Sequence, residues 1–134
     1  MEKTDINSEK DILILSVPQQ QNKILKIKEH PGNRFIALDK ILYINCKGCI
    51  SIVSSVTGEE YNTSEPLKLF DFLLADYGFL RISRNTLINI SHIVSCTFGK
   101  NPGVTMSNFH VLPISKRRIK YMNDRFLKYQ VNHS

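Results

Sequence analysis

The chain of 134 residues has the size of one domain, and its 42% hydrophobic and 22% charged residues exclude wholesale disorder. No apolar run reaches the roughly 18 residues of a membrane span, and the polar, mixed-charge start lacks the features of a secretory signal, so we expect a cytoplasmic protein. The formal net charge of +6 lies entirely in residues 30–134, because basic and acidic side chains balance in residues 1–29, and this excess predicts a polyanionic partner such as nucleic acid.

The first 23 residues have the least organised pattern. Residues 12–15 are apolar and compatible with a short strand, but Pro18 and the polar tract 19–22 after it are typical of a linker. We therefore divide the chain into an N-terminal extension or linker, 1–23, and a domain, 24–130. We expect the extension to be dispensable for folding and available for self-association or partner binding.

Alternating apolar residues and turn signals predict a β-rich domain from Ile24 onwards. Strands are expected at 24–27, 35–38, 41–45, 50–56, 60–63, 79–82, 86–90, 93–98, 104–106 and 111–114. The pattern changes to a helical period over 65–76, with Thr63 or Ser64 as the N-cap, Pro66 in the first turn and Gly78 after the end. The fold class is therefore mainly β with two short helices.

The second helix begins after Ser115, which we expect to cap it. Its apolar stripe, with spacings of three, four and three, consists of Ile119, Met122, Phe126 and Tyr129. Four cations, at positions 116–118 and 120, occupy the first turns of this helix, where the helix dipole favours anions. Clustered cations beside the free N–H groups of a helix start predict a phosphate-binding site.

No arrangement of residues indicates an enzyme. The four histidines lack metal-ligand spacing, His92 and His110 are typical of surface or hydrogen-bonded histidines, and no nucleotide-binding or nucleophile motif occurs. Cys46 and Cys49 form a single C-x-x-C around a predicted hairpin turn, without the second pair of a zinc ribbon. We expect no catalysis, cofactor or metal; the alternatives for the two thiols are zinc binding, redox sensing and a regulatory disulfide.

Two further polar segments carry side chains suited to DNA. Residues 81–86 contain two Arg, an Asn and two hydroxyls, of which Arg and Asn can form paired hydrogen bonds with base edges and the hydroxyls suit phosphate oxygens. The turn at Lys47-Gly48 adds a third basic loop on the same β scaffold. Three such turns are what a protein that binds DNA through loops would need.

Three blocks in order resemble the LytTR family of bacterial DNA-binding domains. They are residues 41–44 (ILYI), 79–89 (FLRISRNTLIN) and 112–117 (LPISKR), and the resemblance extends over about residues 24–128. The chain departs from the usual pattern at Ser83, at Asn85-Thr86 and at Lys116. Asn89 matches an Asn of the middle block, and we interpret it as structural, with a side chain bonded to backbone at a strand end.

The resemblance implies an elongated β-β-β fold and sequence-specific binding of promoter DNA through loops, as in a transcription regulator. The implied DNA-contacting residues are Lys47, Cys49, Ser83, Arg84, Asn85, Lys116 and Arg117. It also implies double-stranded DNA with two adjacent direct-repeat sites, and a homodimer on that DNA. Family members usually follow a phosphorylatable receiver domain, for which this chain has no room. The alternative is a protein-interaction module whose basic face binds an acidic or membrane-bound regulatory partner.

Overall fold

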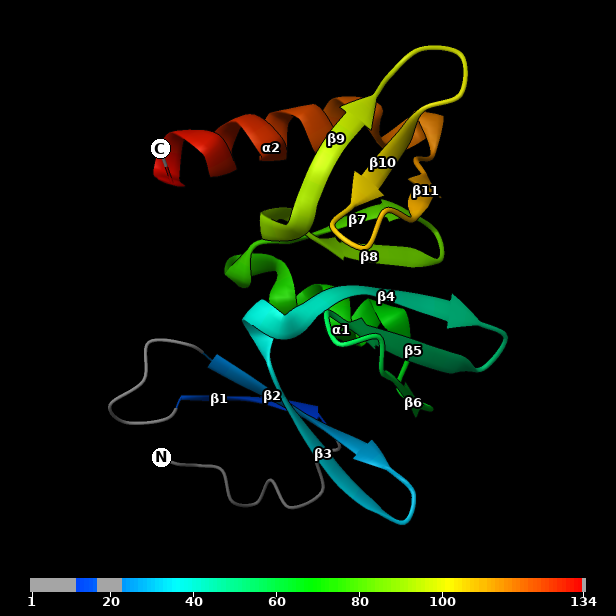
Figure 1. The fold of residues 1–134 in the computed structure, drawn as a ribbon, viewed down its shortest axis with the longest axis vertical. Coiled ribbons are helices and arrows are strands. Elements are labelled where there is room, and N and C mark those ends of the chain that lie inside the picture. Colours follow the sequence, from blue (N-terminus) through cyan, green and yellow to red (C-terminus); the bar gives the residue numbers. More distant parts are fainter. Residues whose placement is uncertain (1–11, 17–22, 134) are drawn as a thin grey trace.

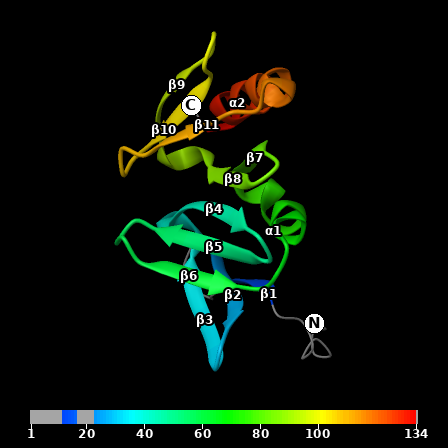
Figure 2. The ribbon, with the colours of Figure 1, turned by 90° about the vertical axis from the view of Figure 1, so that its right-hand side faces the viewer.

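The computed structural model describes residues 12–16 and 23–133, which form three antiparallel sheets stacked along one long axis (Figure 1). The first sheet has the order β1-β2-β3, the middle sheet β6-β5-β4-β8-β7 and the third sheet β11-β10-β9. Figure 2 shows the sheets one above another, with α1 beside the middle sheet and α2 beside the third. This arrangement confirms a mainly β, elongated fold with two helices.

The strands follow the predicted order closely. They are β1 (Ile12–Ser16), β2 (Lys23–Glu29), β3 (Gly32–Ala37), β4 (Ile41–Lys47), β5 (Ile50–Ser55), β6 (Glu60–Thr63), β7 (Phe79–Ser83), β8 (Thr86–Asn89), β9 (Ile93–Thr97), β10 (Gly103–Met106) and β11 (Val111–Pro113). The helices are α1 (Leu67–Leu74) and α2 (Ile119–His133), with short 3-10 turns η2 (Leu38–Lys40), η3 (Ala75–Tyr77), η4 (Ile90–His92) and η5 (Lys116–Arg118).

The middle sheet is buried on both faces, so it carries two hydrophobic cores. Side chains alternate between the faces of a strand, and neighbouring residues therefore enter different cores. Leu87 packs into the core shared with the first sheet and α1, while Ile88 packs into the core shared with the third sheet and α2. On β7, Phe79 likewise packs into the core with the first sheet and α1, and Leu80 packs into the core with the third sheet and α2. This double burial fixes the register of β7 and β8, whose turn belongs to the candidate site.

Helix α1 ends where the sequence predicts but begins differently. Gly78 adopts a left-handed φ of 84° after η3, which confirms its role as the stop signal. Leu67, Phe70 and Leu74 are buried, as the helical pattern indicates. The N-cap position, however, belongs to Pro66, and the predicted caps Thr63 and Ser64 were wrong. Thr63 lies at the end of β6 instead, since its strand pairing with Ser51 holds it in extended backbone.

Helix α2 starts after a single 3-10 turn, η5. Ser115 is at the N-cap position of that turn, but its side chain forms no capping hydrogen bond. Met122 is buried, and Ile119 and Phe126 pack against the same core, which confirms three members of the predicted stripe. The side chain of the fourth, Tyr129, lies outside the described residues, as does the predicted linker at Pro18 and 19–22. Within the described parts of the chain, neither helix is long and apolar enough to cross a membrane.

Residues 12–16 are part of the first sheet. β1 pairs with β2 along its whole length, from Ile12 opposite Ile27 to Ser16 opposite Lys23. Ile12 is 3% exposed and lies in the core beneath the middle sheet. The division into an extension, 1–23, and a domain, 24–130, stays a prediction, and this pairing favours a domain that begins at or before Ile12.

Replacing Ile12 by alanine should lower the free energy of unfolding by about 2–4 kcal/mol, because it deletes a buried aliphatic side chain and leaves a cavity. Urea denaturation followed by circular dichroism measures the change. The matched control is Leu13→Ala, since Leu13 is only half-buried and lies on the other face of β1. A loss below about 1 kcal/mol for Ile12→Ala would support a dispensable first strand instead.

Candidate nucleic-acid interface

The β4–β5 hairpin carries the first predicted segment. Lys47 pairs with Ile50, so Gly48 and Cys49 form a two-residue turn. Gly48 has a φ of 61°, the left-handed conformation that a type II′ hairpin requires at its first central position. The side chains of Lys47 and Cys49 are exposed at this tip. The hairpin therefore presents one cation on a tight, defined turn.

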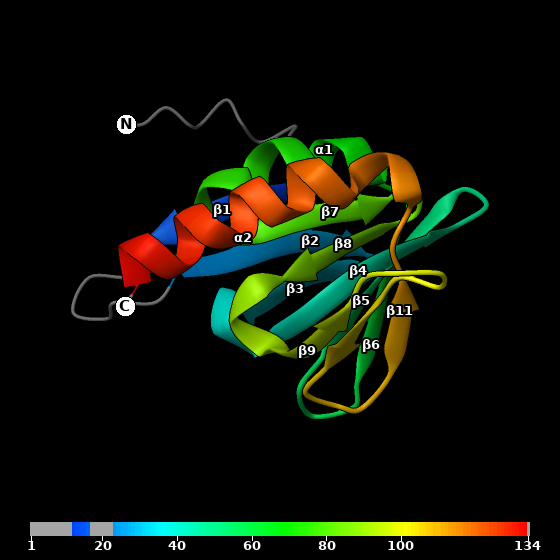
Figure 3. The same ribbon diagram turned by 90° about the horizontal axis from the view of Figure 1, so that it is seen from above.

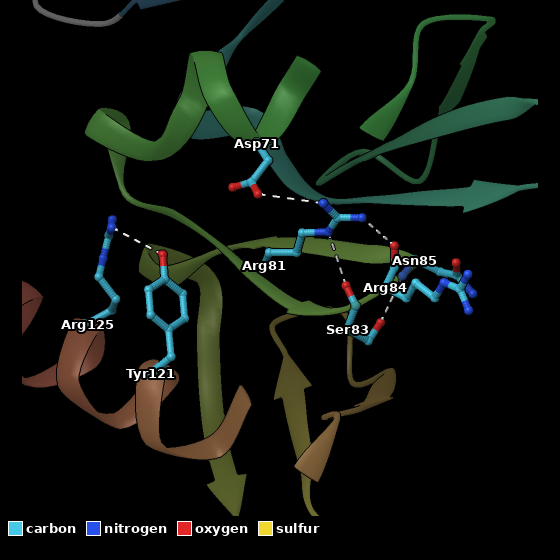
Figure 4. Close-up of polar contacts among 7 residues, drawn as sticks. All are labelled: Asp71, Arg81, Ser83, Arg84, Asn85, Tyr121 and Arg125. Carbon is cyan, nitrogen blue, oxygen red and sulfur yellow. Dashed lines mark hydrogen bonds and ion pairs between the residues drawn. The ribbon is translucent and has the colours of Figure 1, made fainter. Parts of the chain in front are cut away.

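The β7–β8 turn carries the second segment. Ser83 pairs with Thr86 across it, and the Asn85 N–H donates to the Ser83 hydroxyl oxygen at 3.2 Å. The Arg84 side chain is exposed and forms no hydrogen bond or ion pair with any other described residue. Figure 4 shows it extending away from Arg81 and from the body of the domain. Its guanidinium is thus available to a ligand in solution.

The third segment follows β11 and leads into α2. Lys116 and Arg117 are exposed in η5, and Arg118 is half-buried. Neither η5 nor the first turn of α2 contains an acidic residue. The cations therefore lie beside helical N–H groups without local neutralisation, which favours an anion at this position.

Two backbone hydrogen bonds bring these three segments together. The Cys46 N–H donates to the Asn85 carbonyl at 2.8 Å, which joins the base of the β4–β5 hairpin to the β7–β8 turn. The Ser115 N–H donates to the Ile82 carbonyl at 2.8 Å, which joins the start of η5 to the same strand end. All three segments consequently lie on the right-hand side of the molecule in Figures 1 and 3. We call them the three-turn edge: residues 47–49, 83–85 and 116–117.

A side-chain bond supports this register from inside the sheet. The Thr86 hydroxyl donates to the Asn45 Oδ1 at 3.0 Å, and the two residues are paired across β4 and β8. Thr86 is buried, so the bond lies in a region of reduced solvent access and adds to the backbone ladder. The spacing between the β4–β5 hairpin and the β7–β8 turn is therefore fixed by the sheet.

A further loop that could not be assigned to the site from the sequence is joined to the three-turn edge. Lys100 and Asn101, both exposed, lie in the β9–β10 loop, and the Ile114 N–H donates to the Pro102 carbonyl at 3.0 Å just before η5. The signal available in the sequence was a lysine within the glycine- and proline-rich segment 99–103. The β9–β10 loop thus carries a further exposed cation and is joined at its base to the segment that leads into η5.

The polar residues set aside from DNA contact have protein partners. His92 donates from Nε2 to the Asp39 carbonyl at 2.7 Å, and His110 Nδ1 lies 3.0 Å from the Tyr43 hydroxyl, which confirms both as hydrogen-bonded histidines. Asn89 is 4% exposed and bonds to backbone, as interpreted from the sequence. Among residues 12–16 and 23–133, no group of three or more His, Cys, Asp and Glu could hold a metal ion.

The three cysteines are free thiols in different environments. Cys46 packs against the core beneath the middle sheet, whereas Cys49 is exposed at the hairpin tip. Burial raises the pKa of the Cys96 thiol, so this group is protonated near neutral pH and unreactive. Redox control through Cys46 and Cys49 stays a hypothesis from the sequence.

A stack of β-sheets with three basic turns on one edge presents a cationic surface suited to a polyanion. Comparison with known proteins gives the family. The LytTr DNA-binding domain model matches residues 32–126, and the chain belongs to that family. The resemblance found in the sequence is thereby confirmed.

One curated protein and one solved structure resemble this chain. The sensory transduction protein LytR of Staphylococcus saprophyticus is 31% identical over 101 residues, which are 74% of this chain and 39% of that protein. The chain thus spans about two fifths of the length of this relative. The LytTr DNA-binding domain of a putative methyl-accepting/DNA response regulator from Bacillus cereus matches with a TM-score of 0.65 and 19% identity, covering 87% of this chain and 96% of that domain. This second likeness confirms the fold.

Proposed function

We propose that this chain is a sequence-specific transcription regulator that binds bacterial promoter DNA through the three-turn edge. The observation that carries the proposal is the pair of backbone hydrogen bonds from Cys46 and Ser115, which hold three basic turns in one fixed arrangement. It acts by binding and not by catalysis, in the cytoplasm. Two copies occupy adjacent direct repeats, and a regulatory partner supplies the input signal.

Each segment has its own role in this proposal. Arg84 enters a groove, where its planar guanidinium can donate two hydrogen bonds to a guanine edge, and Asn85 beside it suits adenine. Lys116 and Arg117 hold phosphates at the start of α2, where helical N–H groups add to their charge. Lys47, Cys49 and Ser83 contact the sugar-phosphate backbone of the DNA beside the bases that Arg84 and Asn85 read. The separation follows the general rule that phosphate contacts position a protein and base contacts give specificity.

The test starts from selection of a binding site out of a random duplex pool. Fluorescence anisotropy then compares the selected duplex with a scrambled one between about 50 and 200 mM salt. At physiological salt we expect the affinity for the selected duplex to exceed that for the scrambled duplex at least about a thousandfold, which is the lower end of the range for specific protein–DNA recognition. Equal affinities for the two duplexes would refute sequence-specific binding and favour the protein-interaction module, in which the basic face meets an acidic partner.

Replacing Arg117 by alanine should lower the affinity for the selected and the scrambled duplex by the same factor, because a phosphate contact carries no sequence information. It should also reduce the slope of log affinity against log salt by about one, because one fewer phosphate is neutralised and its counterion is not released. Anisotropy titrations across salt give both numbers. The matched control is Arg34→Ala on β3 of the first sheet, which removes the same charge but should leave the slope unchanged. A loss confined to the selected duplex would identify Arg117 as a base-reading residue.

A further inference from the structure

We propose that Arg81 is a positioning residue for DNA recognition: it fixes the β7–β8 turn so that Arg84 is presented to the bases. This inference rests on the proposed function, since it assigns a role within the same site. Arg81 is only three residues from Arg84 and has the same side chain, yet the two guanidinium groups face different surroundings. Arg81 binds the protein, whereas Arg84 extends into solvent.

The Arg81 guanidinium contacts the turn at two carbonyl oxygens. Its Nε donates to the Ser83 carbonyl at 3.2 Å, and its Nη2 donates to the Arg84 carbonyl at 2.6 Å. The third nitrogen, Nη1, lies 3.7 Å from Oδ2 of Asp71 on α1. All three guanidinium nitrogens are therefore engaged, and the side chain is 20% exposed. Figure 4 shows the group lying between α1 and the β7–β8 turn.

The strand pairing alone does not determine this turn. The register of β7 and β8 shifts between Arg81 and Ser83, so the ladder is irregular directly before the turn. A bulge of this kind leaves part of the backbone unpaired and re-aims the side chains beside it. The two N–H donors of Arg81 satisfy carbonyls of the turn at this point, and they link its conformation to the sheet.

The geometry of the guanidinium explains why the position holds arginine. Two carbonyls from successive residues need two donors at a fixed separation in one plane, which a guanidinium provides and an ammonium does not. Because the Arg81 donors already point at protein oxygens, the residue acts on DNA through Arg84 and not by direct contact. Asp71 contributes less to holding the Arg81 guanidinium than the two carbonyls do, since its ion pair with Arg81 is long and partly exposed.

The first experiment needs no DNA. The Cys46 N–H donates to the Asn85 carbonyl, so its hydrogen exchange reports whether the turn keeps its place. In Arg81→Lys, which keeps the charge and the aliphatic stem, exchange at Cys46 should be about tenfold faster, while exchange at buried β4 residues such as Ile44 stays unchanged. Unchanged exchange at Cys46 would overturn the proposal, whatever the protein does with DNA.

The second experiment is a double-mutant cycle on the selected duplex. Arg81→Lys should lower affinity for that duplex about tenfold and affinity for the scrambled duplex less than about twofold. In the Arg84→Ala background, Arg81→Lys should lower the affinity for the selected duplex less than about twofold, because the side chain that Arg81 positions is absent. Additive losses would mean that Arg81 contacts DNA itself, and an unchanged selected-duplex affinity would mean a purely structural role; either result overturns the proposal.

The controls separate this inference from the proposed function. Asp71→Asn removes the ion pair with little change of shape and should alter affinity by less than about threefold. Arg34→Lys makes the same chemical replacement on the first sheet and should alter neither duplex affinity nor Cys46 exchange. If the wild-type protein itself shows no sequence preference, the proposed function fails, and the exchange experiment still decides whether Arg81 fixes the turn.

Discussion

Replacing Asn89 by alanine is expected to lower the free energy of unfolding by about 2–4 kcal/mol, although this residue belongs to neither hydrophobic core and lies outside the three-turn edge. Its amide nitrogen donates to the Leu38 carbonyl at 3.2 Å and to the Ile41 carbonyl at 2.9 Å. Its Oδ1 accepts from both the backbone N–H and the hydroxyl of Ser91, at 3.1 and 2.8 Å. Alanine would remove this donor from the Ile41 carbonyl at a buried site, at about 1–3 kcal/mol, and loss of the two bonds from Ser91 adds about 1 kcal/mol; the Leu38 carbonyl still accepts from the Ile41 N–H.

The position of Asn89 explains why the loss should affect the whole domain. Its two carbonyl partners are the first residue of η2 and the residue directly after it, where the chain passes from the first sheet into the middle sheet, and Ser91 lies in η4, which leads into the third sheet. Urea denaturation measures the effect, and Asn62→Ala on the exposed side of β6 is the matched control. Asn89→Asp keeps the acceptor but not the donors and should be at least as damaging. A loss below about 1 kcal/mol for both Asn89 variants would contradict the structural role.

Replacing Arg84 by alanine is expected to weaken binding of the selected duplex by about 1–3 kcal/mol, or roughly 5- to 150-fold, and to relax the preference at one base position. The folded protein should be unaffected, because the exposed guanidinium forms no hydrogen bond or ion pair with another described residue. The reason for the large effect is the planar donor pair, which discriminates guanine from the other bases.

The measurement is affinity for the selected duplex and for its single-base variants, with unfolding followed in parallel. Arg34→Ala is again the control, because it changes the net charge equally on the first sheet. If Arg84→Ala lowered the affinity for selected and scrambled duplexes by the same factor, Arg84 would be a phosphate contact. The base-reading role would then have to move to Asn85 or to the β4–β5 hairpin.

Much of the fold could be predicted because its signals are local. The hairpin turn at Gly48 and the end of the helix at Gly78 each require a positive φ. Glycine adopts a positive φ without strain, so a glycine in the sequence indicates such a position. The pairing of β1 with β2 could not be predicted in the same way, because it joins segments on either side of Pro18 and the polar tract 19–22, which are typical of a linker. The predicted N-cap of α1 failed because strand pairing at Thr63 outweighed its capping preference.

The candidate site was only partly visible in the sequence. Its three segments could be chosen by composition, but their convergence depends on two backbone hydrogen bonds between distant parts of the chain. The difference between Arg81 and Arg84 was also missed, although the alternation of β7 contains the signal. Phe79 faces the core beneath α1, and Arg81, two residues later, lies on the same face. Composition alone treats the two arginines as equivalent.

The most direct test of a single three-part DNA site is amide chemical-shift mapping of the labelled protein during titration with the selected duplex. We predict that the largest changes fall together on residues 47–49, 83–85 and 116–117, with smaller ones at Lys100 and Asn101. Residues of β1, and Ile24 and Leu25 of β2, should change little, because the first sheet lies below the middle sheet in Figure 1, away from the β7–β8 turn and the start of α2. Largest changes in the first sheet, or in only one of the three segments, would contradict the account.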